Sequence, residues 1–208
     1  MKKDSKTKLL EAGLKEFSKN GYLGATTRDI SQRAGLNISS IMYYYNGKKG
    51  LYASVLELIV KAVEEQFVEL HAQYSTVGKD AIKAKSLLQE FVSKFLSILV
   101  NDDLSKDVKT LFFSEYFKPS EDFNILYDGL ILPFHKRFAH LLILASGGVI
   151  KKQDSLLYIF PIFAQLFMIS SRKSAICQLM NWSEIGDKER KKLLKSIYNQ
   201  IDSLILPQ

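Results

Sequence analysis

The chain has 208 residues, of which 47% are hydrophobic and 25% are charged, so it is long and apolar enough to fold around a sizeable core. Its net charge of +7 is concentrated near the N-terminus: residues 1–52 carry ten Lys or Arg and four acids, whereas residues 53–208 carry nineteen and eighteen. The single cysteine, Cys177, excludes an intrachain disulfide and a cysteine-built zinc site. We therefore expect a cytoplasmic protein whose N-terminal part meets a polyanion.

Apolar residues recur at intervals of three and four along most of the chain, and no stretch alternates as a strand would, which predicts an all-α fold. The first helix is predicted over residues 5–20, where Asn20 and Gly21 end it. A short second helix is expected to begin at Thr26, whose hydroxyl can cap it, and to stop at Gly35. A third helix, capped by Asn37, is predicted to continue through Tyr45.

The rest of the chain is predicted to be helical as well, with polar or Gly/Pro connectors between the helices. The expected helices cover residues 50–74, 79–100, 105–117, 123–145, 155–180 and 188–206. The most apolar stretch, residues 156–169, is interrupted by Pro161 and Gln165 and is shorter than the roughly 20 residues that cross a bilayer. We expect it to be a core or interface helix, and we expect neither a membrane anchor nor an export sequence.

The second and third helices have the pattern of a helix-turn-helix motif at about residues 27–46, in which the later helix enters the major groove of DNA. A helical wheel places four residues of the third helix on an inward half and four on an outward half. The inward residues are Ile38, Ile41, Met42 and Tyr45, and the outward residues are Ser39, Ser40, Tyr43 and Tyr44. The outward hydroxyls, with Lys48 and Lys49 nearby, suit phosphate oxygens and base edges, whereas Tyr45 and Tyr52 are expected in the core.

The longer string "LLEAGLKEFSKNGYLGATTRDISQRAGLNISSIMYYYNGKKGLY" resembles the N-terminal domain of the TetR family of bacterial transcriptional repressors. The resemblance includes the "TTRDI" entry to the second helix, the "AGLN" turn and the tyrosine pair that follows. Two departures stand out: Met42 occupies a position where the family usually has tyrosine, and Lys49-Gly50 replaces a commonly acidic pair. The resemblance implies a DNA-binding domain at residues 1–50 and a larger helical domain for effector binding and dimerisation at residues 51–208.

Positions carried over from the family imply two kinds of DNA contact, to phosphates and to bases or the groove. Thr27 and Arg28, at the start of the second helix, are expected at the phosphate backbone. The remaining candidates are Asn37, Ser39, Ser40 and Tyr43 for bases or the groove, and Tyr44 and Lys48 for phosphates. For each residue, a solvated surface position or a plain helix cap is the alternative.

The resemblance also implies a pocket for a small apolar or aromatic effector in the larger domain. The aromatic candidates for its lining are Phe112, Phe113, Tyr116, Phe117, Tyr127, Phe163 and Phe167, for which an ordinary core position is the alternative. Glu115, His135 and Arg137 are polar groups that could orient such a ligand, although an exposed face or a satisfied core position is more typical for His135.

Pairing with a second copy is a further implication of the resemblance, through residues 155–180 and 188–206, which would place two recognition helices on a palindromic operator. The predicted function is a repressor that leaves its operator when the effector binds. The alternative is an architectural, nucleoid-associated DNA-binding protein with no effector. The three histidines, His71, His135 and His140, have no neighbouring nucleophile or carboxylate cluster, so we expect no enzyme, no metal and no cofactor.

Overall fold

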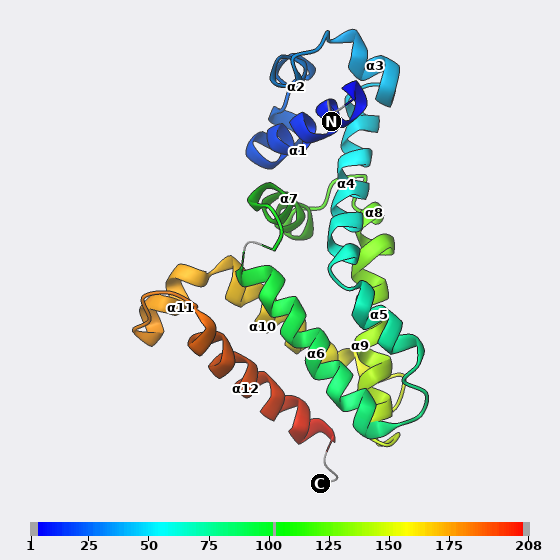
Figure 1. Ribbon diagram of the computed structural model, residues 1–208, viewed down its shortest axis with the longest axis vertical. Helices are drawn as coiled ribbons and strands as arrows, with labels where there is room; N and C mark the ends of the chain where they lie inside the picture. The colour runs from blue at the N-terminus through cyan, green and yellow to red at the C-terminus, as the bar shows by residue number, and fades with distance from the viewer. Residues whose placement is uncertain (1–3, 102, 206–208) are drawn as a thin grey trace. The chain divides into compact units, whose positions relative to one another are not determined.

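A computed structural model of the protein describes residues 4–101 and 103–205, and this described part is helical, without strands (Figure 1). The all-α prediction is therefore confirmed. The chain divides into two compact units that are interleaved in sequence. Unit 1 comprises Met1–Glu64 and Leu104–Ile131, and unit 2 comprises Glu65–Asp103 and Leu132–Gln208, including the few residues outside the described part. The predicted boundary at residue 50 thus falls inside unit 1.

Unit 1 combines the N-terminal helices with a later stretch of the chain. Its elements are α1 (Ser5–Gly24), α2 (Thr27–Ala34), α3 (Ser39–Tyr45), α4 (Lys48–Glu65), α7 (Lys106–Phe117), α8 (Asn124–Leu126) and the π-helical turn η1 (Tyr127–Ile131). The helix α1 packs against both α2 and α7, and the Ser18 hydroxyl of α1 donates a 2.8 Å hydrogen bond to Asp107 of α7. Phe17 of α1 is buried, and its ring packs edge to face against the ring of Tyr52 in α4. The apolar side of α1 therefore packs against the other helices of unit 1.

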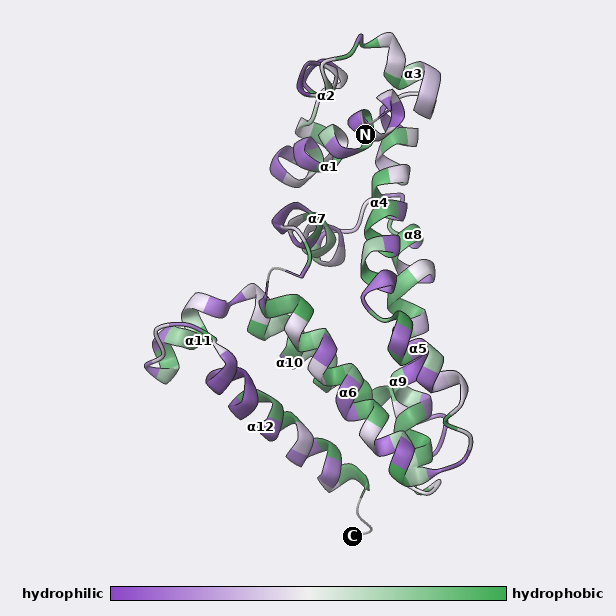
Figure 2. Cartoon of the chain, viewed as in Figure 1, coloured by the Kyte–Doolittle hydropathy of each residue, from purple (hydrophilic) through white to green (hydrophobic). Residues whose placement is uncertain are grey.

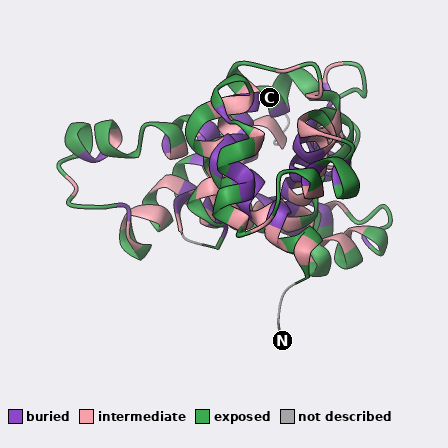
Figure 3. Cartoon of the chain, turned by 90° about the horizontal axis from the view of Figure 1, so that it is seen from above, coloured by how far each residue is buried: buried purple, intermediate pink, exposed green. Residues whose placement is uncertain are grey.

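Unit 2 is a bundle around a core rich in phenylalanine. Its elements are α5 (Val68–Ser75), α6 (Ala81–Val100), α9 (Leu132–Ala145), α10 (Ser155–Ser171), α11 (Lys173–Met180) and α12 (Asp187–Ile205). The helix α6 lies at its centre, in contact with α5, α9, α10 and α12. Phe67, Phe91 and Phe134 are fully or almost fully buried there, and buried residues lie on the sides of helices that face other helices (Figure 3).

Three of the long helices were wrongly predicted to be continuous, because each of them is interrupted in the structure. The helix expected over residues 50–74 breaks at Phe67, whose backbone leaves the helical region while its ring is buried against Phe134. The helix expected over 123–145 contains η1 just before Pro133, which has no N–H to continue the α-helical hydrogen bonds. The helix expected over 155–180 bends by 89° between α10 and α11, at Arg172.

Other expectations hold closely. The predicted helix 105–117 is α7, capped by the Ser105 hydroxyl, and α12 ends at Ile205, while residue 206 of the predicted helix 188–206 lies outside the described residues. The single cysteine, Cys177, is buried. Among the described residues no single helix is long and apolar enough to cross a bilayer, although α10 and α11 would qualify by length and composition if their bend is disregarded.

Candidate DNA-binding interface

The first helix of the motif, α2, begins and ends as its sequence predicts. The hydroxyl oxygen of Thr26 accepts a 3.1 Å hydrogen bond from the Asp29 backbone N–H, and the same hydroxyl donates to the Asp29 carboxylate at 2.6 Å. At the other end, Gly35 has φ +66°, a left-handed conformation that costs glycine little. The chain therefore turns sharply between α2 and α3.

Buried side chains hold α3 in place. Ile41 and Tyr45 lie one turn apart on α3 and are buried, and Ile30 of α2 is fully buried in the same unit. The Tyr45 hydroxyl donates a 2.7 Å hydrogen bond to the backbone carbonyl of Lys6 in α1. Burial, with a smaller contribution from Asp4, raises the pKa of Tyr45 to about 12, so its hydroxyl stays protonated at neutral pH. The core positions predicted for Tyr45 and Tyr52 are confirmed.

The opposite side of α3 is exposed. Tyr43 is 82% exposed, and its ring contacts the ring of Tyr44 edge to face at 4.8 Å between centroids. Ser39 is also exposed, while Ser40 is half-buried. The hydroxyl-bearing face predicted for this helix is thus available to a partner.

The helical-wheel assignment of Ile38 and Met42 to the inward half was wrong. Ile38 is 49% exposed and Met42 is 63% exposed. The short α3 contacts the rest of the unit mainly through Ile41 and Tyr45, so residues on the flanks of this pair remain in solvent. The outward surface of α3 is therefore broader and more apolar than the wheel predicted.

The remaining polar candidates surround α3. The helix begins at Ser39, one residue later than a cap at Asn37 predicts, but the Asn37 side-chain oxygen accepts hydrogen bonds from the Ser39 N–H at 3.1 Å and from the Ser39 hydroxyl at 3.2 Å. Asn37 thus caps the helix from one residue further out than predicted. Thr27 and Arg28 lie in the first turn of α2, half-buried and exposed respectively. The helix dipole favours anions at that end.

The two lysines at the start of α4 have different surroundings. The Lys48 ammonium lies over the ring of Tyr22, 4.7 Å from its centroid, and 3.4 Å from the carbonyl oxygen of Leu23. The Lys49 ammonium is 3.1 Å from the Glu121 carboxylate, which raises the pKa of Lys49 through this hydrogen bond and charge. Lys49 is therefore partly neutralised by its partner, whereas Lys48 lies beside uncharged groups.

A buried hydrogen-bond network supports α4 behind this surface, and no sequence pattern indicates its geometry. The Tyr52 hydroxyl donates to the Glu115 carboxylate of α7 at 2.5 Å, and Ser120 donates to the other carboxylate oxygen through its hydroxyl at 2.8 Å and its backbone N–H at 3.2 Å. Glu115 is buried, and burial together with this hydrogen bond raises the pKa of Tyr52 well above its usual value. The carboxylate is thus held by three donors, and this network accounts for a polar side chain that the sequence had left as a possible ligand contact.

The aromatic effector candidates do not form one continuous group. Phe112, Phe113, Tyr116 and Phe117 of α7 pack on one another in unit 1, with Phe112 buried and Phe117 exposed. Tyr127 is exposed and contacts Phe123. Phe163 and Phe167 are buried in unit 2, where both rings pack on Phe95. His135 stacks on Phe163 at 4.1 Å, and Arg137 contacts His71, so both polar candidates have partners within unit 2.

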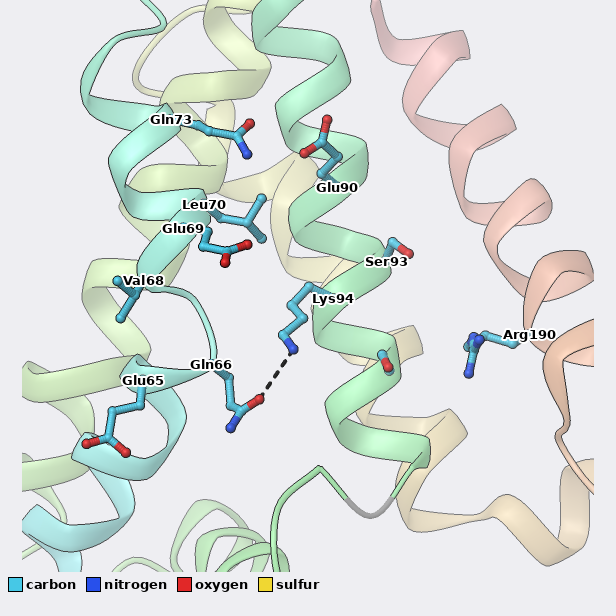
Figure 4. Close-up of a pocket in the computed structure, with 11 residues that line it drawn as sticks. Glu65, Gln66, Val68, Glu69, Leu70, Gln73, Glu90, Ser93, Lys94 and Arg190 are labelled. Atoms are coloured by element: carbon cyan, nitrogen blue, oxygen red, sulfur yellow. Dashed lines mark hydrogen bonds between the residues drawn. The ribbon is translucent and has the colours of Figure 1, made fainter.

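Unit 2 also contains a cleft that the sequence analysis missed (Figure 4). It has a volume of about 680 Å³ and lies along α6, with residues of α5 on one side and Arg190 of α12 on the other. Its lining is mostly polar: Glu69 and Glu90 bring negative charge, and Lys94 donates a 3.3 Å hydrogen bond to Gln66. These residues are distant in sequence, and only the packing of the helices brings them together.

One face of α10 is apolar and exposed. Leu157, Phe160, Pro161, Ala164 and Met168 recur at intervals of three and four, and all five are exposed. The opposite face, which includes Ile159 and Phe163, is buried in unit 2. The helix is therefore apolar nearly all round, and the parts of α10 that are visible beside α6 in Figure 2 are mostly green. A helix of this kind is typical of an interface.

These features define a helix-turn-helix DNA-binding protein with a second helical unit. Residues 9–55 match the family model described as bacterial regulatory proteins of the tetR family. Residues 84–206, more than half of the chain, match the model of the C-terminal domain of the HTH-type transcriptional dual regulator CecR. The chain therefore belongs to the TetR family of DNA-binding transcriptional regulators and carries a C-terminal domain of the CecR type. Regulators of this family bind operator DNA, typically as dimers.

Individual relatives agree with this assignment. The dual regulator CecR of Shigella flexneri is 23% identical over 208 residues, covering 97% of this chain and 91% of its own length. The fold is similar to that of the fatty acid degradation regulator FadR from Bacillus halodurans, with a TM-score of 0.65, 15% identity, and coverage of 97% and 96% of the two chains. AibR, solved with isovaleryl coenzyme A and operator DNA, has a TM-score of 0.66, 14% identity, and coverage of 94% and 97%. CecR and FadR are described as regulators rather than as enzymes.

Proposed function

We propose that the protein is a homodimeric repressor that acts in the bacterial cytoplasm and leaves a palindromic operator when a small molecule binds. The observation that carries the DNA-binding part is the outward face of α3, where Ser39 and Tyr43 are exposed while Ile41 and Tyr45 anchor the helix. A hydroxyl-bearing helix held rigidly from behind can enter the major groove without losing its position. Repression then follows where the operator overlaps a promoter, because the bound dimer excludes other proteins from the same DNA.

The proposed contacts fall into groups by their chemistry. Thr27 and Arg28 lie at the N-terminus of α2, where the helix dipole and free N–H groups favour a phosphate. Tyr44 and Lys48 supply further donors to phosphates. The proposed contacts to bases and the groove are Asn37, Ser39, Ser40 and Tyr43, of which Tyr43 lies directly opposite the buried side of α3.

A comparison of the two neighbouring lysines tests the phosphate contacts. Lys48→Ala should weaken operator binding and make it less sensitive to salt, because each phosphate contact that is lost lowers the slope of log K against log salt by about 0.9. A dimer that loses one contact in each half-site should lose about 1.8. Fluorescence anisotropy on the full-length protein at several salt concentrations gives this slope.

Lys49→Ala is the matched control, since the Lys49 ammonium is already paired with Glu121. We expect its salt slope to remain closer to that of the unmodified protein. Equal slopes for the Lys48 and Lys49 variants would contradict a specific phosphate contact by Lys48. Absence of salt-sensitive binding to every duplex would contradict the proposed function as a whole.

Dimerisation is proposed through the exposed apolar face of α10, with α12 completing the interface. Phe160→Glu should weaken the dimer about a hundredfold or more, because each copy would bury an unpaired carboxylate. The control is Phe117→Glu on α7, since Phe117 and Phe160 are both 61% exposed. Sedimentation equilibrium should give monomers for the first variant and dimers for the second. Dimers of unchanged stability in both would exclude this face.

Two sites in the protein could bind an effector, and each site suits a compound of a different chemical class. The aromatic residues of α7, Phe113 and Phe117 among them, suit an apolar or aromatic compound. The cleft along α6 in unit 2, with Glu90, Lys94 and Arg190, suits a compound that also carries charged or polar groups. An effector at either place can release DNA only through its difference in affinity for the bound and free conformations, typically about 1 to 3 kcal/mol.

The effector proposal is tested by operator release. A library of small metabolites is added to the complex of the full-length protein with a fluorescent operator, and a fall in anisotropy identifies compounds that weaken binding. Lys94→Ala and Phe113→Ala then assign an active compound to the polar cleft or to the aromatic residues. If compounds bind the protein but leave its operator affinity unchanged, the protein is better described by the alternative, an architectural DNA-binding protein.

A further inference from the structure

The apolar flank of α3 consists of Ile38 and Met42, which lie four residues apart and therefore on the same side of the helix. Ile38 occupies the N-cap position of α3, where its side chain makes no hydrogen bond, and both side chains are substantially exposed. Successive residues of a helix are turned by about 100°, which places Ser40 and Tyr44 on the other flank. Thus α3 has a hydroxyl-bearing flank and an apolar flank on either side of Ser39 and Tyr43.

These two side chains have no role in the interior of unit 1. The buried contacts of α3 are made by Ile41 and Tyr45. A single exposed apolar side chain needs no explanation, but here two of them form a continuous edge on the helix that faces DNA in the proposed function. Neither side chain can donate a hydrogen bond to a phosphate oxygen. An apolar group in the groove is therefore the partner that this flank suits.

The major groove of DNA presents one apolar group on its base edges, the C5 methyl of thymine. We propose that Ile38 and Met42 bind thymine methyl groups and so make the protein selective for thymine at defined positions of each operator half-site. This inference rests on the proposed function, because it requires α3 to lie in the major groove. The unbranched thioether of Met42 adapts its shape readily, which suits a contact with a methyl group at the edge of the helix.

The polar and apolar flanks then have separate tasks. Tyr44 offers its hydroxyl to the phosphate backbone and Ser40 offers its hydroxyl to the groove, whereas Ile38 and Met42 distinguish thymine from the other bases. The family resemblance places tyrosine at the position of Met42, so this chain has exchanged a hydroxyl for an apolar group there. We expect the exchange to alter which base is preferred rather than to abolish binding.

Replacing thymine by deoxyuridine tests the proposal, because it removes only the methyl group. The operator is first obtained by selecting duplexes from a random library with the full-length protein. Each thymine of the selected half-site is then replaced by deoxyuridine, and affinity is measured by anisotropy. Loss of one buried methyl should weaken binding about fourfold, or about sixteenfold when both half-sites are changed. At least one position should show this loss.

The protein variants identify the side chain responsible. In Met42→Ala or Ile38→Ala, the affinity ratio between thymine and deoxyuridine should fall toward one at the contacted position. Ile82→Ala, at an exposed apolar residue of α6 in unit 2, should retain the full ratio, and circular dichroism should show that all three variants keep their helix content. If the ratio is the same in all of these proteins, or if no thymine position shows a loss, the methyl contact is excluded. If the selection recovers no preferred duplex, the proposed function itself is contradicted.

Discussion

Replacing Gly50 by alanine should destabilise unit 1 by about 1 to 3 kcal/mol, as expected when a methyl group is forced into a filled space. A Cβ atom at this position would overlap the backbone carbonyl oxygen of Tyr45, the last residue of α3. Backbone atoms cannot rotate away as the end of a flexible side chain can. The α3 helix, the turn after it or the start of α4 would have to move. Urea unfolding of the full-length protein gives the change in the free energy of unfolding.

The matched control for Gly50 is Gly24, at the end of α1. A Cβ atom there would be 3.5 Å from the Cβ of Asn20, an ordinary van der Waals contact, so Gly24→Ala should change stability by less than about 0.5 kcal/mol. Equal stability of the two variants would show that the α3–α4 turn relaxes without cost. Gly50 permits a closer approach of α4 to Tyr45 than a residue with a side chain would.

Tyr52→Phe is the second substitution with a large expected effect. It removes one of three donors to the buried Glu115 carboxylate, and leaving a buried polar group short of a partner costs about 1 to 3 kcal/mol. The phenyl ring itself remains, so the packing against Phe17 is preserved. The loss in the free energy of unfolding should therefore report the hydrogen bond rather than a cavity.

An exposed tyrosine provides the control for this loss. Tyr43→Phe makes the same chemical change where the ring is in solvent, and it should alter stability by less than about 0.5 kcal/mol. If Tyr52→Phe is as stable as Tyr43→Phe, the Glu115 carboxylate does not depend on Tyr52. Operator binding by Tyr43→Phe is a separate measurement, because Tyr43 is proposed to contact DNA.

Local chemistry made the recognition motif predictable. The cap at Thr26, the left-handed Gly35 and the buried Ile41 and Tyr45 each follow from interactions within a few residues or from helical periodicity. The helical wheel misplaced Ile38 and Met42 because it assigns half of the helix surface to the interior. In the seven-residue α3 only a narrow stripe, formed by Ile41 and Tyr45, is buried. How far the side chains on the flanks of α3 are exposed depends on how closely the neighbouring helices approach α3.

Features that depend on distant parts of the chain could not be predicted. Glu115 and Tyr52 are 63 residues apart, and their hydrogen bond exists because α7 packs in the same unit as α4. The break at Phe67 likewise depends on rings from α6 and α9 that bury its side chain. Sequence patterns describe each helix well but contain little information on which helices meet.

The interleaving of the two units has a consequence for chimeric regulators. The helix α1 of the DNA-binding region packs on α7, and its Ser18 is hydrogen bonded to Asp107, so the N-terminal helices depend on a segment encoded far downstream. A fragment cut after α4 would lose this support and expose the apolar side of α1. Grafting the DNA specificity of this protein onto a homologue should therefore require residues 104–131 to be transferred together with residues 1–64.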